Sequence, residues 1–415
     1  MAQPRSGLAD VLAATAIAGA ASYLITWLVP RVIGFDQYAV FAVFWAALYL
    51  VVGTLAGLQQ EVARGTLPAD PHAPERVNKA RNFGVVTAVL VASTILVTAP
   101  AWAGVTFPAG QWPLVIPLAV GSASYALVAV LGGTLQGLGR WRATALLIVS
   151  DAVLRVAAMG IVLVVTHDLV ALAWAAALPF GVAIVLVWPL VRSRVVGKAQ
   201  LDVGYRRLTW NVSRTVTAAA ATGVMVSGFP LIFGIAANDR PAAIVGMVVL
   251  AVTLVRAPLV VVAMALQAWL LVRFRDHSAA AARLLALSLV VILGLGAAIA
   301  VVGWAVGPPV FAWLFPDEPV PSAGFLAGLV ASSALVAALV VTGAALLARS
   351  QHHSFTAGWV VGAVVTIGAT LLPWEPEPLA LAALLAGPLA GLLVHGAALV
   401  IARGGSSASE EPALG

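Results

Sequence analysis

Two charged residues, Asp151 and Arg155, lie four positions apart in the middle of the apolar run 144–166. In an α-helix this spacing puts both side chains on one face, about 6 Å apart along the axis. Because charges at membrane depth are costly, they face a polar cavity or a partner. Two hypotheses follow. The residues form a self-neutralising pair that stabilises packing, or they face a cavity in which Arg155 binds an anion once Asp151 is protonated or turns away.

Arg256 is a second charge within an apolar run, and Pro258 follows it closely. Pro258 removes a backbone donor and kinks the helix, so we expect Arg256 to point into an aqueous cavity. A guanidinium stays charged and binds phosphate in a bidentate fork. Arg155 and Arg256 are therefore the candidate substrate-binding residues. Arg214 either joins them or extends toward the lipid headgroups.

Four further polar residues lie near the ends of the first two apolar runs. Asp10 either binds a cation or proton, as Asp151 could, or is a helix-start residue favoured by the helix dipole. Gln60, Glu61 and Arg64 follow the second run. Glu61 and Arg64 are spaced to form a local ion pair, which would fix the helix end or gate the mouth of a cavity.

The composition places these residues in a membrane protein. Of the 415 residues, 62% are hydrophobic and 9% are charged, whereas soluble domains carry roughly 25% charge. No Asp, Glu, Lys or Arg occurs from Phe83 to Gly139. Runs of about 20 apolar residues are long enough to span a bilayer. The predicted spans are 8–29, 38–58, 83–106, 114–136, 144–166, 170–191, 210–237, 242–270, 284–306, 323–347, 355–373 and 379–402.

Basic residues alternate between the loops. Seventeen of the 22 Lys and Arg residues fall at the two ends or in every second loop, and only Arg31 and Arg240 fall in the loops between. Cytoplasmic loops carry this excess, so the pattern predicts a multi-pass protein of the bacterial inner membrane with both termini in the cytoplasm. The same bias explains the net charge of +6, and no nucleic-acid partner is expected.

A charged connection divides the spans equally. We predict an N-terminal six-helix lobe at 1–191, a cytoplasmic linker at 192–209, a C-terminal six-helix lobe at 210–402 and a disordered tail at 403–415. The predicted fold class is therefore all-α, a polytopic membrane protein of about 12 transmembrane helices in two six-helix lobes.

The sequence lacks the residues that several kinds of site and reaction require. Cysteine is absent, which excludes disulfides, zinc–cysteine clusters and thiol catalysis. The sequence has no P-loop, H-E-x-x-H or G-x-S-x-G motif. His352 and His353 have no third ligand nearby, and His395 is expected to be a hydrogen-bonded core histidine. No metal, cofactor or enzymatic activity is expected.

Several segments carry a family resemblance. They are Pro30–Phe41, Leu58–Arg64, Gly133–Trp141, Asp151–Arg155 and Val255–Leu259. Together they resemble the polysaccharide flippases of the multidrug/oligosaccharidyl-lipid/polysaccharide exporter (MOP) superfamily. The number of predicted spans matches the family along the whole chain, and the matching motifs cover about a third of it.

The resemblance implies a MATE-like flippase fold and alternating access by rocking of two lobes. It also implies a polyprenyl-diphosphate-linked oligosaccharide as substrate, moved outward for surface polysaccharide synthesis. Membrane lipid and the glycosyltransferases or polymerase of the same pathway would be its partners. One alternative is a cation-coupled multidrug antiporter, which would line its cavity with acids. Another is a membrane enzyme or scaffold of envelope glycan assembly.

Overall fold

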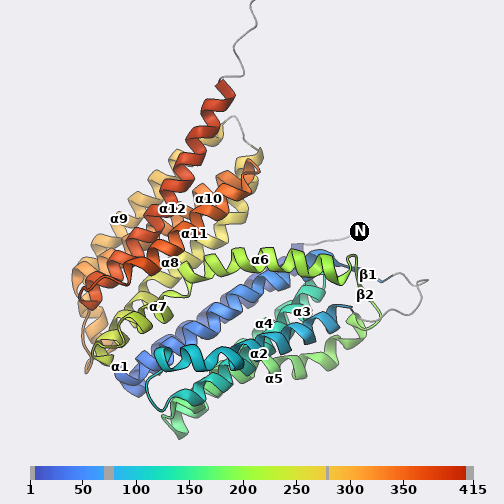
Figure 1. The fold of residues 1–415 in the computed structure, drawn as a ribbon, viewed down its shortest axis with the longest axis horizontal. Coiled ribbons are helices and arrows are strands. Elements are labelled where there is room, and N and C mark those ends of the chain that lie inside the picture. Colours follow the sequence, from blue (N-terminus) through green and yellow to red (C-terminus); the bar gives the residue numbers. More distant parts are fainter. Residues whose placement is uncertain (1–4, 70–78, 277–279, 408–415) are drawn as a thin grey trace, which may run out of the picture. The chain divides into compact units, whose positions relative to one another are not determined.

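The computed structural model describes residues 5–69, 79–276 and 280–407 (Figure 1). Helices dominate this part of the chain, which confirms the predicted all-α membrane architecture. The elements are α1 (Arg5–Gly65), β1 (Thr66–Pro68), α2 (Lys79–Thr106), the 3-10 turn η1 (Trp112–Leu114), α3 (Val115–Gly137), α4 (Trp141–Val165), α5 (Leu169–Val195), β2 (Ala199–Leu201), α6 (Tyr205–Val226), α7 (Phe229–Ala236), α8 (Ala242–Asp276), α9 (Ala281–Leu314), α10 (Ala323–Ala348), α11 (His352–Ala369) and α12 (Pro376–Ser407).

The first two predicted spans both lie in α1. This segment is two helices joined at Gly34, whose φ of 77° and ψ of 163° are not helical. A positive φ is readily adopted only by glycine, so Gly34 makes the turn. Within the described residues, nine helices are long and apolar enough to cross a membrane, or ten if α6 and α7 form one span. The second half of α1 and the 18-residue α11 account for the other two predicted spans.

The seventh predicted span, 210–237, is divided between α6 and α7. Gly228 precedes α7, and Pro230 lies in its first turn. Proline there lacks an amide donor that a continuous helix would need, and its fixed φ suits a helix start. At the other end of the chain, α12 continues to Ser407, past the predicted start of the tail at 403. Residues 408–415 of that predicted tail lie outside the described residues.

The chain forms two compact units, Met1–Gly223 and Val224–Gly415. The boundary lies within α6, beyond the predicted linker at 192–209. In the first unit, α3 packs against α1, α2 and α5, and α4 packs against α1 and α5. Close approach of α1 and α3 depends on Gly133, where an added Cβ would lie 2.6 Å from the carbonyl oxygen of Gln59.

The second unit is built around α10. This helix packs against α8, α9 and α12, and α11 packs against α12. Most of the α10 side chains from Phe325 to Leu346 are buried. The polar groups of α10 bond back to its own helix, as Ser333 does to Leu329 O at 2.9 Å. A central helix surrounded by the other helices of its unit explains why α10 is apolar around its whole circumference.

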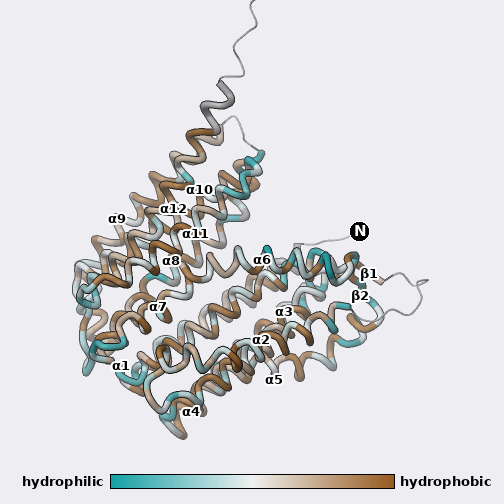
Figure 2. Tube along the Cα trace, in the orientation of Figure 1, coloured by the Kyte–Doolittle hydropathy of each residue, from teal (hydrophilic) through white to brown (hydrophobic). Residues whose placement is uncertain are grey.

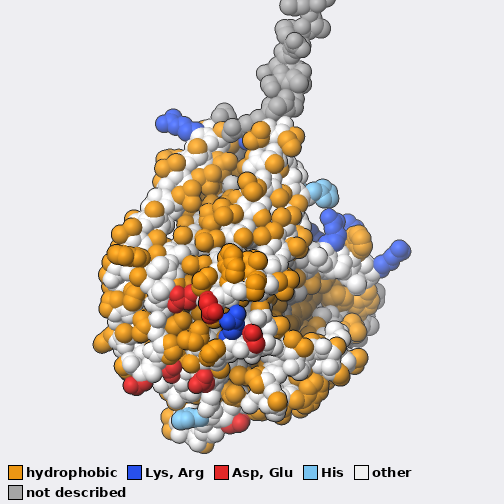
Figure 3. Space-filling view, turned by 60° about the vertical axis from the view of Figure 1, so that its left-hand side comes forward, with side chains coloured by type: hydrophobic (Ala, Val, Ile, Leu, Met, Phe, Trp, Pro, Cys, Tyr) orange, Lys and Arg blue, Asp and Glu red, His pale blue; other side chains and the backbone are white. Residues whose placement is uncertain are grey.

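Large apolar side chains remain exposed on the outer helices. On α9, Val290, Val301 and Trp304 are 68%, 67% and 58% exposed. Figure 2 shows hydrophobic residues along the helices and hydrophilic ones mainly at helix ends and loops. Figure 3 shows apolar side chains spread over the whole visible face, with the acidic side chains in its lower part. An apolar surface this extensive is suited to contact with lipid tails, so the protein is a multi-pass membrane protein.

Two short strands join distant loops of the first unit. β1 pairs with β2 in antiparallel register, with Thr66 opposite Leu201 and Pro68 opposite Ala199. Asp202 N donates to Gly65 O at 2.9 Å, which extends the pairing to the end of α1. The loop after the second span is thereby fixed to the segment between α5 and α6.

Candidate functional site

Arg155 is the centre of a buried polar network in the first unit. Its Nη2 donates to Asp151 Oδ1 at 2.5 Å, on the same helix, α4. Its Nη1 donates to the Tyr49 hydroxyl on α1 at 2.7 Å, and its Nε donates to the Ala176 carbonyl on α5 at 3.2 Å. The ion pair of the first hypothesis is therefore present, and the binding of an anion by Arg155 in a cavity stays a prediction. All three guanidinium nitrogens have a partner, so the network connects three helices.

Aromatic rings enclose the same guanidinium. Arg155 Cζ lies 4.3 Å from the ring centroid of Phe180 and 5.7 Å from that of Tyr49. Trp45 stacks on Tyr49 at 4.7 Å, and Tyr125 meets Phe180 edge-on at 5.1 Å. The negative ring faces favour the cation and exclude water from it, which strengthens its hydrogen bonds. Arg155 is thus held in one orientation by partners on three helices.

Arg256, on α8 in the second unit, has a different environment. It is 3% exposed, and its Nε has no hydrogen-bond partner in the described part of the chain. Nor does any carboxylate of the described ranges lie within ion-pair distance of it. Its buried neighbours along the helix are apolar, with Val252 one turn before it and Val260 one turn after. Within the described residues, Arg256 is therefore a buried guanidinium without a counter-charge, and the aqueous cavity expected around it stays a prediction.

Arg214 and Asp10 lie in more exposed places than these two arginines. Arg214 is exposed on α6. Asp10, near the start of α1, accepts from Arg142 Nε on α4 at 3.3 Å, and their side chains are 38% and 83% exposed. An ion pair this exposed contributes little to stability. The predicted role of Asp10 in ion coupling stays a prediction.

The predicted ion pair at the end of α1 is present. Arg64 pairs with Glu61 Oε2, and Glu61 is 8% exposed. Glu61 Oε1 also accepts from the Thr215 hydroxyl on α6 at 2.7 Å. Gly57 allows this approach, since an added Cβ there would lie 2.9 Å from the Thr215 backbone. Gln60 is exposed, and the gating role proposed for these residues stays a prediction.

Replacing Thr215 with valine is expected to destabilise the first unit by about 1–3 kcal/mol, because Glu61 would lose a donor while staying buried. The measurement is the shift in unfolding midpoint in detergent. Thr217→Val is the matched control, since Thr217 is exposed and its hydroxyl bonds to Ser213 O on its own helix. Equal shifts for the two variants would contradict the prediction.

His395 in α12 is the hydrogen-bonded core histidine that the sequence predicts. It is fully buried. Its Nε2 lies 3.1 Å from Phe355 O, which can only accept, and its Nδ1 lies 2.9 Å from Thr342 Oγ1. Phe355 also stacks on the imidazole at 6.3 Å. The ring therefore joins α10, α11 and α12.

Sequence reasoning missed the partners that come from other helices. Tyr49 carries a hydroxyl in the middle of the second span, as Thr54 does five residues later, and nothing in the sequence singles out Tyr49 as the partner of Arg155. Ala176 contributes only its backbone carbonyl, and nothing in the sequence indicates it. Arg155 lies in the first unit and Arg256 in the second, so their action on one substrate stays a prediction.

No family model matches the chain. Several curated proteins do match the chain in sequence. Protein Rv1510 of Mycobacterium tuberculosis is 32% identical over 401 residues, which cover 95% of this chain and 92% of the relative. Protein Rv3630 of the same organism is 32% identical over 400 residues, covering 94% and 91%. This chain belongs to their family. Both relatives are described as uncharacterized, so the family does not supply an activity.

Solved structures of other proteins share the fold of this chain. An inward-facing multidrug resistance MATE transporter of the MOP superfamily has a TM-score of 0.65 at 14% identity, covering 94% of this chain and 96% of its own. The lipid II flippase MurJ, inward closed, has a TM-score of 0.66 at 10% identity, covering 91% and 87%. A MOP transporter from Pyrococcus furiosus, described as having a binding pocket of reverse polarity, has a TM-score of 0.54 at 16% identity, covering 96% of each chain. The chain thus has the MOP superfamily fold, as the sequence resemblance predicts.

Proposed function

We propose that the protein is a transporter that flips a polyprenyl-diphosphate-linked oligosaccharide outward across the bacterial inner membrane. The observation that carries this proposal is Arg256, which is buried and has no carboxylate partner in the described part of the chain. An unpaired buried charge costs several kcal/mol, so its presence in an apolar helix favours a functional role. A diphosphate supplies the missing counter-charge and matches the guanidinium fork.

The charges within the spans favour an anionic substrate over a cationic drug. Asp151 is already neutralised by Arg155, which leaves Arg214 and Arg256 as unpaired charges among the described span residues. A multidrug antiporter would need a carboxylate free to bind a cation. The relatives with this fold include both drug exporters and a flippase, and the charge balance here supports the flippase.

In the proposed cycle, Arg256 binds the diphosphate while the prenyl tail stays in lipid, and the two lobes rock to expose the sugar outside. Arg155 holds α1, α4 and α5 together through its three hydrogen bonds. It would have to release Asp151 before it could bind substrate, so the geometry favours Arg256 as the first phosphate contact. An inside-negative membrane potential drives an anion outward, by about 2.3 kcal/mol per charge per 100 mV.

Arg256→Gln is expected to slow flipping by about 10- to 100-fold, because a charge-assisted hydrogen bond is worth about 1.5–3 kcal/mol. The measurement is the amount of lipid-linked oligosaccharide that accumulates in a deletion strain complemented with each variant. The same variant should melt no lower than the wild type, because it removes an unpaired charge.

Arg275→Gln is the matched control, since Arg275 is on the same helix and its side chain is 72% exposed. It should leave the lipid-linked pool unchanged. If Arg256→Gln is well folded and exports glycan at the wild-type rate, Arg256 does not bind the substrate.

A further inference from the structure

One face of α6 combines basic and aromatic side chains. Arg206, Trp210 and Arg214 are spaced by four residues, and Arg207 precedes Arg214 by seven, so all four lie on adjacent rows of one helical surface. Each of them is exposed, and Trp210 is 64% exposed. We call this surface, Arg206, Arg207, Trp210 and Arg214, the α6 basic face.

The opposite side of α6 is anchored in the first unit. Leu208 is 1% exposed and packs in a cluster with Leu58 of α1 and Leu201 of β2. About two turns further on, the Thr215 hydroxyl bonds to Glu61 at 2.7 Å. The helix is therefore fixed on the unit in a single rotational setting, and this setting presents the α6 basic face outward.

Among the residues that the structure describes, the arginines of this face have no acidic partners. None of Arg206, Arg207 and Arg214 forms an ion pair with any carboxylate of residues 5–69, 79–276 or 280–407. By contrast, the arginines at the neighbouring helix ends, Arg64 and Arg142, are both paired with acids. Three unpaired guanidinium groups beside an indole make a surface that is complementary to a negatively charged partner.

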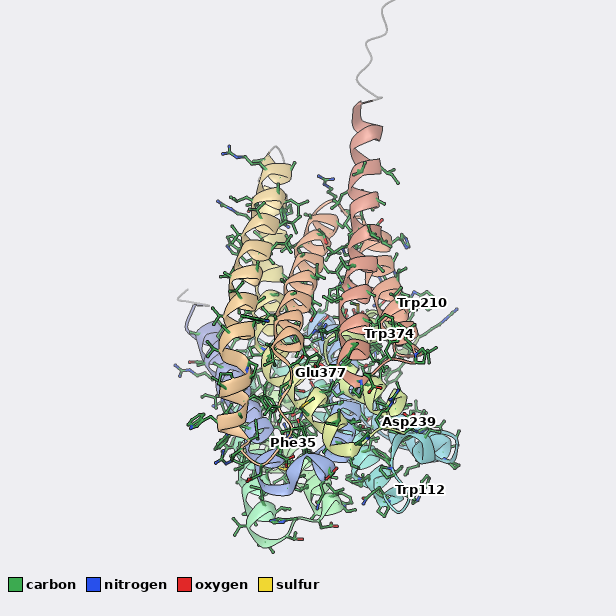
Figure 4. The ribbon with its side chains drawn as sticks, turned by 90° about the vertical axis from the view of Figure 1, so that its left-hand side faces the viewer. Phe35, Trp112, Trp210, Asp239, Trp374 and Glu377 are labelled. Atoms are coloured by element: carbon green, nitrogen blue, oxygen red, sulfur yellow. The ribbon has the colours of Figure 1, made fainter. Side chains whose placement is uncertain are left out.

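The position of the face indicates which anion it meets. The N-terminus of α6 follows β2, so it lies at the same end of the unit as the C-terminal end of α1. Trp210 of the α6 basic face is labelled in Figure 4. Tryptophan is enriched where a membrane protein crosses the headgroup layer, and clustered arginines at that depth attract anionic lipids. If these arginines served only to set the membrane topology, they would need neither to share one helical face nor to lie beside a tryptophan.

We infer that the α6 basic face binds the phosphate headgroups of anionic lipids in the adjoining leaflet. Arg206, Arg207 and Arg214 contact phosphate oxygens, and the Trp210 indole lies at the boundary with the acyl chains. The inference goes beyond the proposed transport, because it concerns lipids that need not be moved. The α6 basic face would also raise the local concentration of any phosphate-bearing lipid.

The test counts bound lipid on the purified full-length protein by native mass spectrometry, with phosphatidylglycerol as probe and phosphatidylcholine as the uncharged comparison. The variant R206Q/R207Q/R214Q is expected to retain at least about fivefold less phosphatidylglycerol, since each arginine near the headgroups contributes a factor of about five. Phosphatidylcholine retention should not change. Trp210→Ala should lower the retention of both lipids.

The matched control is R192Q/R194Q/K198Q, which removes the same charge from exposed residues at the end of α5 and just after it. It should keep most of the bound phosphatidylglycerol. Equal losses in both triple variants, or no loss in the α6 variant, would overturn the inference. So would displacement of the lipid by inorganic pyrophosphate at equal concentration, because the site would then bind a free anion. Retention is measured without transport, so a normal export rate in Arg256→Gln would leave this result unaffected.

Discussion

Arg155→Ala is expected to lower the free energy of unfolding by about 3–5 kcal/mol, the cost of breaking a buried ion pair by removing one partner. The substitution removes the counter-charge of Asp151, whose partly buried side chain is 18% exposed and pairs with Arg155 at 2.5 Å in the wild type. It also removes the donors to the Tyr49 hydroxyl and the Ala176 carbonyl. The measurement is the unfolding midpoint in a titration with denaturing detergent.

Two comparisons make this result specific. Arg240→Ala removes an ion pair to Glu375 at 3.4 Å, in which the side chains are 30% and 78% exposed. It should cost less than about 1 kcal/mol. Adding Asp151→Ala to Arg155→Ala should recover part of the loss, because the unpaired carboxylate is then gone. If the Arg155→Ala protein has the same unfolding midpoint as the wild type, the network does not stabilise the unit.

Gly358→Leu is expected to destabilise the second unit by about 3 kcal/mol, at the upper end of overpacking effects. A Cβ at this position of α11 would collide with the His395 ring and would lie 3.1 Å from the Gly391 carbonyl oxygen. The ring cannot turn aside cheaply, because both of its nitrogens are hydrogen-bonded to other helices. The measurement is again the unfolding midpoint in detergent.

The same helix provides the control for this substitution. Gly368 is exposed, and a Cβ there would meet nothing within 4 Å. Gly368→Leu should therefore be neutral or slightly stabilising, because leucine is a better helix former than glycine. Gly358→Ala is a milder variant if the leucine protein does not accumulate. Similar midpoints for Gly358→Ala and Gly368→Ala would mean that α11 and α12 can separate without cost.

Local patterns predicted the fold well. The apolar runs and the alternation of basic loops gave spans that correspond to the helices, because hydropathy and charge act residue by residue. The pairs Asp151–Arg155 and Glu61–Arg64 were predictable for the same reason, since helical spacing alone brings them together. The interruption before α7 has a local cause in Gly228 and Pro230, but the predicted span 210–237 ran through it.

Contacts between helices could not be predicted in the same way. The partners Tyr49 and Ala176 reach Arg155 only because α1 and α5 pack beside α4, and packing geometry depends on many small side chains at once. The bond from Thr215 to Glu61 spans 154 positions of sequence. The strands β1 and β2 have three residues each, which is too short for an alternating pattern to identify.

One group of charged residues in the second unit lies away from its core. Arg240 lies between Asp239 and Glu375, and Glu377 accepts from the Ser322 backbone amide at 2.9 Å. Figure 4 labels Asp239, Trp374 and Glu377 in this region. Arg240 Nη2 also donates to the Trp374 carbonyl at 3.3 Å. These contacts connect the loops before α8, α10 and α12, while Arg256 remains the buried charge without such a partner.

The pairing of Thr66–Pro68 with Ala199–Leu201 has a consequence for biosynthesis. The first strand leaves the ribosome before α2, α3, α4 and α5 are made, so it must wait for its partner until the sixth span has been inserted. The small sheet therefore cannot form until all the helices from α1 to α5 have been made. Its formation marks the moment at which the nascent N-terminal half is topologically complete.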